Sequence, residues 1–280
     1  MHEKATTVQP GREVLPGYEV VALLSHGRRI DTYDVYSTER DCRCIVKILR
    51  PDRRDEVRVR EAVIQEGTLL RHLTHPHLVR GYEVVHKPVP AMVLETLNGA
   101  TLAALIEDNP LSVSDSATLG LQLASVLGYL HRQGWLHLDV KPANIVVESG
   151  RATLIDLSLV GRPGSGRPGA GTRGYLSPEQ ALGENLSPAS DVWGLGVTLL
   201  ESLTDEMPFG EEATWGSRRR LPLIHRRAPA APRLAPGLPG AYEDLLRRCL
   251  DQRPDARPSL DRVRSSLHDL VDDSTGVSAG

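Results

Sequence analysis

Cysteine, aromatic residues and long apolar runs are all scarce in this chain of 280 residues. The three cysteines, Cys42, Cys44 and Cys249, are odd in number and match no metal-ligand spacing, so a reduced setting is expected. No apolar run approaches the length of about 18 residues that a membrane-spanning helix needs, and the N-terminal residues contain no apolar signal core. These absences predict a cytoplasmic protein without a membrane span.

Charge of one sign is not in excess either. The chain has 33 Lys and Arg residues against 36 Asp and Glu residues, a net charge of −3. This balance argues against nucleic acid or a membrane surface as partner. Lysine occurs only at positions 4, 47, 87 and 141, so Lys47 and Lys141 stand out in an arginine-rich chain. Lysine is a compact point charge and arginine a planar fork, and the two are not equivalent beside a phosphate.

The residue pattern predicts a part rich in strands followed by a mainly helical part. Short segments rich in β-branched and aromatic residues occupy 18–49, and a helical period follows over 55–73. Later helices are expected after Ser112, after Ser187–Pro188, and over about 241–250 and 259–270. Irregular segments are expected at residues 1–16 (a flexible polar arm), 215–240 (a loop rich in Pro and Arg) and 272–280 (a polar tail).

The polar segment "HLDVKPAN", residues 137–144, lies between an apolar helical run and an apolar strand. Within six residues it supplies the carboxylate of Asp139, the cation of Lys141 and the amide of Asn144. It resembles the catalytic loop H-R-D-x-K-x-x-N of the eukaryotic-type serine/threonine protein kinases, in a bacterial-like form, except that Leu138 replaces the arginine. The resemblance extends from about Tyr18 to Leu270.

This resemblance implies an α+β, bilobal protein-kinase-like fold over residues 17–271. A small β-rich N-lobe would cover about 17–95, a hinge 95–99, and a larger helical C-lobe 100–271. The activity that it implies is phosphotransfer from ATP, dependent on Mg²⁺ with Mn²⁺ as a substitute, to Ser or Thr hydroxyls of protein substrates.

The resemblance also assigns roles in the helical part. Asp139 would orient the substrate hydroxyl and accept its proton, and Lys141 would place a positive charge near the γ-phosphate. Asn144 and Asp156 of "LIDLSL" would bind the metal and the nucleotide through oxygen atoms, which are hard donors suited to Mg²⁺. This second motif replaces the family's D-F-G with Asp156, Leu157 and Ser158, and the serine reduces backbone freedom.

In the strand-rich part, "CIVKIL" resembles the strand whose lysine contacts the α- and β-phosphates, here Lys47. Its expected carboxylate partner is Glu66, nine residues before the His75 of "LTHPHLV", with Glu61 and Glu56 as alternatives. The adenine site is expected at "LETLNG", where Leu94 would be the gatekeeper and the backbone of Glu95 and Leu97 would bind the base.

Four further residues resemble structural positions of the family. Thr172 of "GTRGYLSPE" is expected to hydrogen-bond Asp139 and Lys141. Glu179 is expected to pair with Arg257, and Asp191 of "SDVWGLG" is expected to brace the backbone of the catalytic loop.

The glycine-rich loop departs most from the family pattern. Ser25, Gly27 and Ile30 stand where the family has three glycines, and only Gly27 is retained for nucleotide binding. This departure and Ser158 favour an alternative, a pseudokinase that acts as a nucleotide-binding or scaffolding module with little turnover. A phosphotransferase acting on small molecules is a third alternative, disfavoured by Lys141, Thr172 and "SPE".

A basic cluster, "RRRLPLIHRR" from Arg218 to Arg227, is the last feature that suggests a partner. A solvated loop would account for it, and a docking site for an acidic partner, steered by charge, is the more specific alternative.

Overall fold

The computed structural model describes residues 7–209 and 237–276. The chain divides into two compact units, Met1–Asn98 and Gly99–Gly280. Within the described ranges, no helix combines the length and the apolar character that crossing a membrane requires. The predicted α+β composition, with strands first and helices later, is confirmed.

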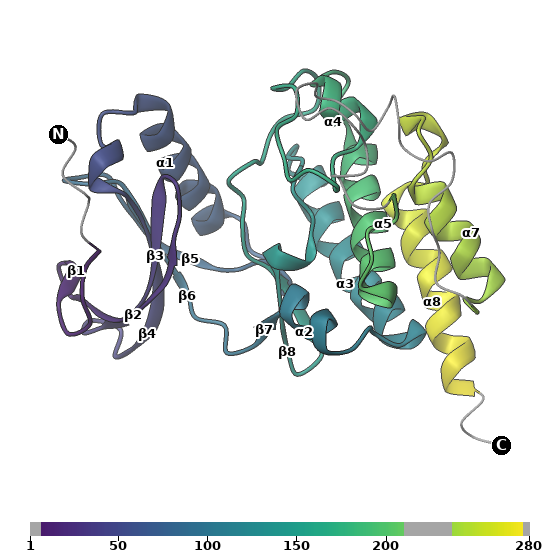
Figure 1. The fold of residues 1–280 in the computed structure, drawn as a ribbon, viewed down its shortest axis with the longest axis horizontal. Coiled ribbons are helices and arrows are strands. Elements are labelled where there is room, and N and C mark those ends of the chain that lie inside the picture. Colours follow the sequence, from purple (N-terminus) through teal and green to yellow (C-terminus); the bar gives the residue numbers. More distant parts are fainter. Residues whose placement is uncertain (1–6, 210–236, 277–280) are drawn as a thin grey trace. The chain divides into compact units, whose positions relative to one another are not determined.

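The first unit is an antiparallel sheet covered by a helix (Figure 1). Its strands are β1 (Glu13–Leu15), β2 (Tyr18–His26), β3 (Ile30–Ser37), β4 (Cys42–Leu49), β5 (Gly81–Val85) and β6 (Ala91–Glu95). Among the described residues of this unit the strand order is β1-β2-β3-β4-β6-β5. Helix α1 (Val57–His72) packs on β5 and β6. The sheet therefore carries β4 in its middle, with partners on both sides.

Helix α1 is set close to the sheet by its residue pattern. Val59, Val63 and Leu70 are buried, at the spacing of one helix face. Between them lies Gly67, where an added Cβ would come within 3.0 Å of Met92 Cβ on β6. The absence of a side chain at Gly67 thus lets the helix approach β6 closely, which brings the buried Glu66 near the sheet.

The described part of the N-terminal segment, from residue 7, differs from the flexible polar arm expected over residues 1–16. Residues 13–15 form β1 and pair with β2. Leu15 is buried in the same apolar cluster as Tyr33, and the Val8 N–H donates to the Tyr33 hydroxyl at 3.0 Å. The chain reverses at Gly17, whose φ of +80° is readily adopted by glycine. Burial of a single leucine within a polar segment is the reason that the pattern did not reveal this strand.

The second unit contains a small sheet and a helical body. Its strands are β7 (Ala100–Thr101), β8 (Ile145–Glu148) and β9 (Arg151–Leu154), in that order in the sheet. Its described helices are α2 (Leu102–Asp108), α3 (Val113–Arg132), α4 (Pro178–Leu182), α5 (Pro188–Thr204), α7 (Gly240–Cys249) and α8 (Leu260–Gly276). Helix α5 packs against α3 and α7, and α8 packs against α3 and α7 (Figure 1).

Local signals at the helix ends account for these bounds. The Ser112 hydroxyl accepts from the Asp115 N–H at 3.1 Å, so Ser112 is the predicted N-cap of α3. Ser187 caps α5 in a capping box with Ser190, and Pro188 occupies the first turn as expected. Helix α8 continues to Gly276, so residues 272–276 of the expected polar tail are helical.

Candidate functional site

Lys47 on β4 and Glu66 on α1 form an ion pair within the first unit. The Lys47 Nζ and Glu66 Oε1 atoms lie 3.0 Å apart, and the two side chains are 16% and 2% exposed. The other two candidate partners are placed elsewhere, since Glu61 is exposed and Glu56 accepts from Arg53 at 2.8 Å. A pair this deeply buried gains little net stability, because desolvation offsets the attraction, but it holds the ammonium group in one place.

The turn between β2 and β3 carries the degenerate glycine-rich loop. The Gly27 N–H donates to the Ile30 carbonyl at 3.0 Å, and an added Cβ on Gly27 would lie only 2.6 Å from that oxygen. The N–H of the one retained glycine is therefore used inside the turn, and a phosphate would have to displace that bond to reach it. Arg28 and Arg29, both exposed, occupy the tip of the turn.

Side chains brace this turn from the strand side. His26 Nδ1 lies 2.8 Å from the buried Asp31 carboxylate, and Arg50 Nη1 lies 2.8 Å from His26 Nε2. Arg50 also donates to the Gly27 carbonyl at 3.0 Å. Because a guanidinium group only donates, the His26 Nε2 atom is the acceptor of its contact with Arg50. Sequence reasoning did not identify this brace.

The expected adenine-binding segment lies at the end of β6. Leu94 is buried, and Leu97 is half-buried just beyond the strand. The Glu95 N–H donates to the Arg80 carbonyl at 3.0 Å, while the Glu95 carboxylate accepts from the Arg80 N–H at 2.8 Å. With its N–H engaged, Glu95 would contribute its carbonyl oxygen to a base.

The predicted catalytic loop surrounds the Asp139 carboxylate with donors in the second unit. Oδ1 accepts from the Thr172 N–H at 3.0 Å and from the Thr172 hydroxyl at 2.8 Å. Oδ2 accepts from Lys141 Nζ at 2.7 Å and from Asn144 Nδ2 at 2.9 Å. The side chain is 9% exposed. Lys141 also donates to the Thr172 hydroxyl, so the contacts expected of Thr172 with Asp139 and Lys141 are both present.

Asn144 and Asp156 lie at the same end of the β8–β9 hairpin. Asn144 ends the short 3₁₀ helix η2 (Pro142–Asn144) just before β8, and its carbonyl accepts from the Ile155 N–H at 3.0 Å. Asp156 is the next residue along, and its Oδ1 accepts from the Ser158 N–H at 2.7 Å. Leu157 is buried while Ser158 is exposed, so the apolar residue anchors this turn.

Asp191 on α5 is buried below the catalytic loop. Its carboxylate accepts from the backbone N–H groups of His137 at 2.8 Å and Leu138 at 2.7 Å, and it lies 2.7 Å from His131 Nε2. Burial alone would raise the pKa of Asp191, but the His131 side chain and these donors outweigh burial and lower the pKa below its ordinary value. Burial lowers the pKa of His137, against the nearby carboxylates, so His137 is neutral.

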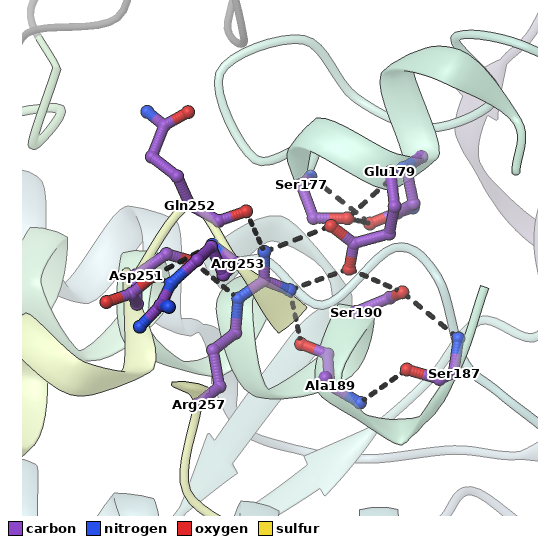
Figure 2. Close-up of polar contacts among 10 residues, drawn as sticks. Ser177, Glu179, Ser187, Ala189, Ser190, Asp251, Gln252, Arg253 and Arg257 are labelled. Atoms are coloured by element: carbon purple, nitrogen blue, oxygen red, sulfur yellow. Dashed lines mark hydrogen bonds and ion pairs between the residues drawn. The ribbon is translucent and has the colours of Figure 1, made fainter. Parts of the chain in front are cut away.

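Glu179 on α4 and Arg257 form the buried pair drawn in Figure 2. Arg257 contacts both carboxylate oxygens, at 2.6 and 3.0 Å, and donates to the Ala189 carbonyl at 2.8 Å and to the Asp251 carbonyl at 2.8 Å. The Ser190 hydroxyl donates to Glu179 at 2.8 Å. Burial tends to raise the pKa of Glu179, but Arg257 and Ser190 outweigh it, so the pKa lies below its ordinary value of 4.5.

Sequence reasoning missed two side chains that support the catalytic loop, one through Asp191 and one directly. His131 reaches Asp191 from α3, and the Gln180 side-chain amide donates to the Leu138 carbonyl at 2.8 Å. For Gln180 a signal was available, because S-x-x-Q from Ser177 is a capping-box pattern that predicts an ordered glutamine. The basic cluster Arg218–Arg227 lies outside the described residues.

The Glu179–Arg257 pair leads to a test of stability. Glu179→Gln should lower the free energy of unfolding by about 3–5 kcal/mol at neutral pH, because it leaves a buried guanidinium without its counter-charge. Because the folded-state pKa of Glu179 is lowered, the ionised carboxylate contributes its full stabilisation of the fold above pH 4.5. This stabilisation is lost as the pH falls through the lowered pKa of the folded state. The difference between wild type and variant should therefore narrow below pH 4.5.

Urea unfolding at a series of pH values measures both effects. Glu243→Gln is the control, because Glu243 pairs with Arg247 on the surface, where the side chains are 39% and 44% exposed, and such pairs contribute about 0–1 kcal/mol. Equal losses in the two variants would contradict a structural role for the Glu179–Arg257 pair.

Comparison with known proteins supplies the family. The Protein kinase domain family matches residues 18–268. The chain is 31% identical over 245 residues to the serine/threonine-protein kinase PkaA of Streptomyces coelicolor, covering 84% of this chain and 44% of that protein. It is 27% identical over 258 residues to the serine/threonine-protein kinase PrkC of Bacillus subtilis, covering 87% of this chain and 39% of that protein.

A plant relative gives the same result. The chain is 31% identical over 230 residues to CBL-interacting protein kinase 21 of Oryza sativa, covering 79% of this chain and 43% of that protein. The chain thus spans about two fifths of the length of these relatives. The match extends through both units, and the chain belongs to the protein kinase family, as a eukaryotic-type serine/threonine kinase domain.

Proposed function

We propose that this chain transfers the γ-phosphoryl group of ATP, bound with Mg²⁺ or Mn²⁺, to Ser or Thr hydroxyls of protein substrates. The observation that carries the proposal is the buried Asp139 carboxylate, whose two oxygens are held by Thr172, Lys141 and Asn144. These hydrogen bonds fix the direction of the Asp139 carboxylate. Positioning of this kind is the main contribution that a protein makes to phosphoryl transfer.

The chemistry of Asn144 and Asp156 fits a divalent cation. The Asn144 amide nitrogen donates to the Asp139 carbonyl and to its carboxylate, both at 2.9 Å, which orients the amide oxygen away from them. Among the described residues no cluster of three or more His, Cys, Asp or Glu side chains could hold a metal. Mg²⁺ suits this arrangement, because it commonly takes one or two protein oxygens and completes its shell with water and phosphate oxygens. When bound, the cation would neutralise phosphate charge.

Asp139 and Lys141 would carry the transfer step. The substrate hydroxyl donates to Asp139, its oxygen forms the new bond to the γ-phosphorus, and the bond from that phosphorus to the β–γ bridging oxygen breaks. The hydroxyl proton goes to Asp139 and ADP leaves. Lys141, 2.7 Å from the Asp139 carboxylate, would supply positive charge to the transferring group.

Residues of the first unit would bind the nucleotide. Lys47, held by Glu66, would contact the α- and β-phosphates. Leu94 would border the adenine, and backbone groups of Glu95 and Leu97 would hydrogen-bond it. The exposed Arg28 and Arg29 would reach the phosphates with their side chains, since the Gly27 N–H is engaged in the turn.

A pseudokinase remains the second candidate, and the turn at Gly27 is the observation that favours it. Its internal hydrogen bond removes a backbone donor that a phosphate would otherwise use. The proposed acidic partner of Arg218–Arg227 and the protein substrate receive no support from the described residues.

Removing or freeing one of the positioned charges should strongly reduce phosphate transfer. We expect Asp139→Asn and Glu66→Gln to reduce phosphate incorporation by about a hundredfold or more, since each removes or frees a charge worth several kcal/mol in the transition state. The assay is transfer of labelled γ-phosphate to a generic protein substrate. Glu61→Gln is the matched control on the same helix, because Glu61 is exposed. Equal incorporation by wild type and Asp139→Asn would exclude the kinase function.

The turn at Gly27 should bind phosphate through the side chains of Arg28 and Arg29. We expect Arg28→Ala/Arg29→Ala to weaken MgATP binding by about tenfold or more, because hydrogen bonds to charged groups contribute roughly 1.5–3 kcal/mol each. Calorimetric titration of MgATP and of adenosine would separate phosphate from base contacts, and only MgATP binding should change. Arg58→Ala, at an exposed position of α1, is the control.

Ile30→Gly tests the alternative that the turn at Gly27 binds phosphate poorly because it lacks glycines. If Ile30→Gly tightens MgATP binding while Arg28→Ala/Arg29→Ala binds MgATP as wild type does, the arginine side chains do not replace the missing glycines.

A further inference from the structure

Leu138, between His137 and Asp139, has a backbone conformation that leucine rarely adopts. Its φ is +64°, in the left-handed region where the Cβ atom crowds the backbone. Such a residue costs free energy and persists only where its surroundings determine the conformation. At Leu138 both backbone polar groups are held by buried side chains. The N–H donates to Asp191 at 2.7 Å, and the carbonyl accepts from Gln180 at 2.8 Å.

Gln180 has little freedom to turn away. It is 4% exposed at the start of α4, and its Oε1 accepts from the Ser177 N–H at 3.4 Å and the Ser177 hydroxyl at 3.2 Å. Because the amide oxygen is used in this cap, the amide nitrogen faces Leu138. Gln180 therefore has two separable contacts, a cap through its oxygen and a bond to the catalytic loop through its nitrogen.

The segment that contacts Asp139 also passes this point. An added Cβ on Gly171 would lie 3.4 Å from the Leu138 carbonyl oxygen and 3.6 Å from Gln180 Nε2. Thr172, the next residue, donates twice to Asp139. The catalytic loop, α4 and the segment that carries Thr172 therefore lie close together at the Leu138 carbonyl.

We propose that Gln180 is a positioning residue for phosphotransfer. Its N–H bond to the Leu138 carbonyl holds the left-handed peptide from which Asp139 projects, and so sets the direction of the Asp139 carboxylate. The inference rests on the proposed kinase function, but the hydrogen bond itself can be tested without it.

Gln180→Glu separates the two contacts. A glutamate keeps the oxygen that caps α4 but replaces the N–H donor with an oxygen that repels the Leu138 carbonyl. We expect kcat to fall by about tenfold or more, with KM for MgATP within about twofold, since the contact acts on the geometry of Asp139 and not on nucleotide binding. Backbone amide exchange at Leu138 and Asp139 should accelerate by a similar factor.

Gln122→Glu is the matched control. The Gln122 side chain on α3 makes the same pair of contacts away from the site, donating to the Gly150 carbonyl at 2.9 Å and accepting from the Ala152 N–H at 2.7 Å. Like Gln180→Glu, the Gln122→Glu variant adds one negative charge and removes a side-chain amide N–H donor. We expect kcat and the exchange of Leu138 and Asp139 to remain as in wild type. A merely structural effect of losing a glutamine amide would lower kcat in both variants.

A second variant tests the backbone conformation. Asparagine adopts the left-handed region more readily than leucine does, so Leu138→Asn added to Gln180→Glu should restore part of the lost exchange protection and of kcat. The proposal is overturned if exchange at Leu138 and Asp139 is unchanged in Gln180→Glu, or if exchange rises while kcat stays at the wild-type value. A wild type that transfers no phosphate would refute the proposed function, while the exchange comparison would still test the hydrogen bond.

Discussion

The arrangement of the second unit depends on one buried carboxylate, that of Asp191. It accepts the backbone N–H groups of His137 and Leu138, and it also binds His131. Two successive peptide groups are thereby fixed to α5, and the next residue is Asp139. Since these contacts lower the pKa of Asp191, it stays charged although it is buried. An ionised acceptor holds backbone donors more strongly than a neutral one does.

Helix α5 also contacts the buried ion pair of Glu179 and Arg257. Besides Asp191, it contributes the Ala189 carbonyl to Arg257 and the Ser190 hydroxyl to Glu179. Arg257 is thus fixed between α4 and α5, and α4 in turn carries Gln180 to the Leu138 carbonyl. The buried charges of Glu179 and Arg257 thus have each other as partners, as burial requires. The catalytic loop is consequently attached to α5 directly through Asp191 and indirectly through α4.

Much of the fold and of the candidate site could be predicted, because local signals and family motifs occur at the residues that cap the helices and form the site. Ser112 and Ser187 mark helix starts by hydrogen bonds within one turn, which a sequence shows directly. The Lys47–Glu66 pair followed from motif spacing. By contrast, β1 depends on Leu15 joining a distant apolar cluster, and the Gly27 turn depends on His26 and Arg50 meeting across strands. Contacts of this kind arise from tertiary packing, and no local pattern encodes them.

The most direct test of the role of Asp191 is backbone amide exchange at His137 and Leu138 in folded Asp191→Asn. Asparagine offers a single, uncharged oxygen acceptor in place of a carboxylate, so it cannot hold both amides and His131 as Asp191 does. Exchange at one or both amides should accelerate by about tenfold or more, since bonds to a charged acceptor contribute roughly 1.5–3 kcal/mol. Asp244→Asn, at an exposed position of α7, should leave both unchanged. Wild-type protection of both amides in Asp191→Asn would contradict the account.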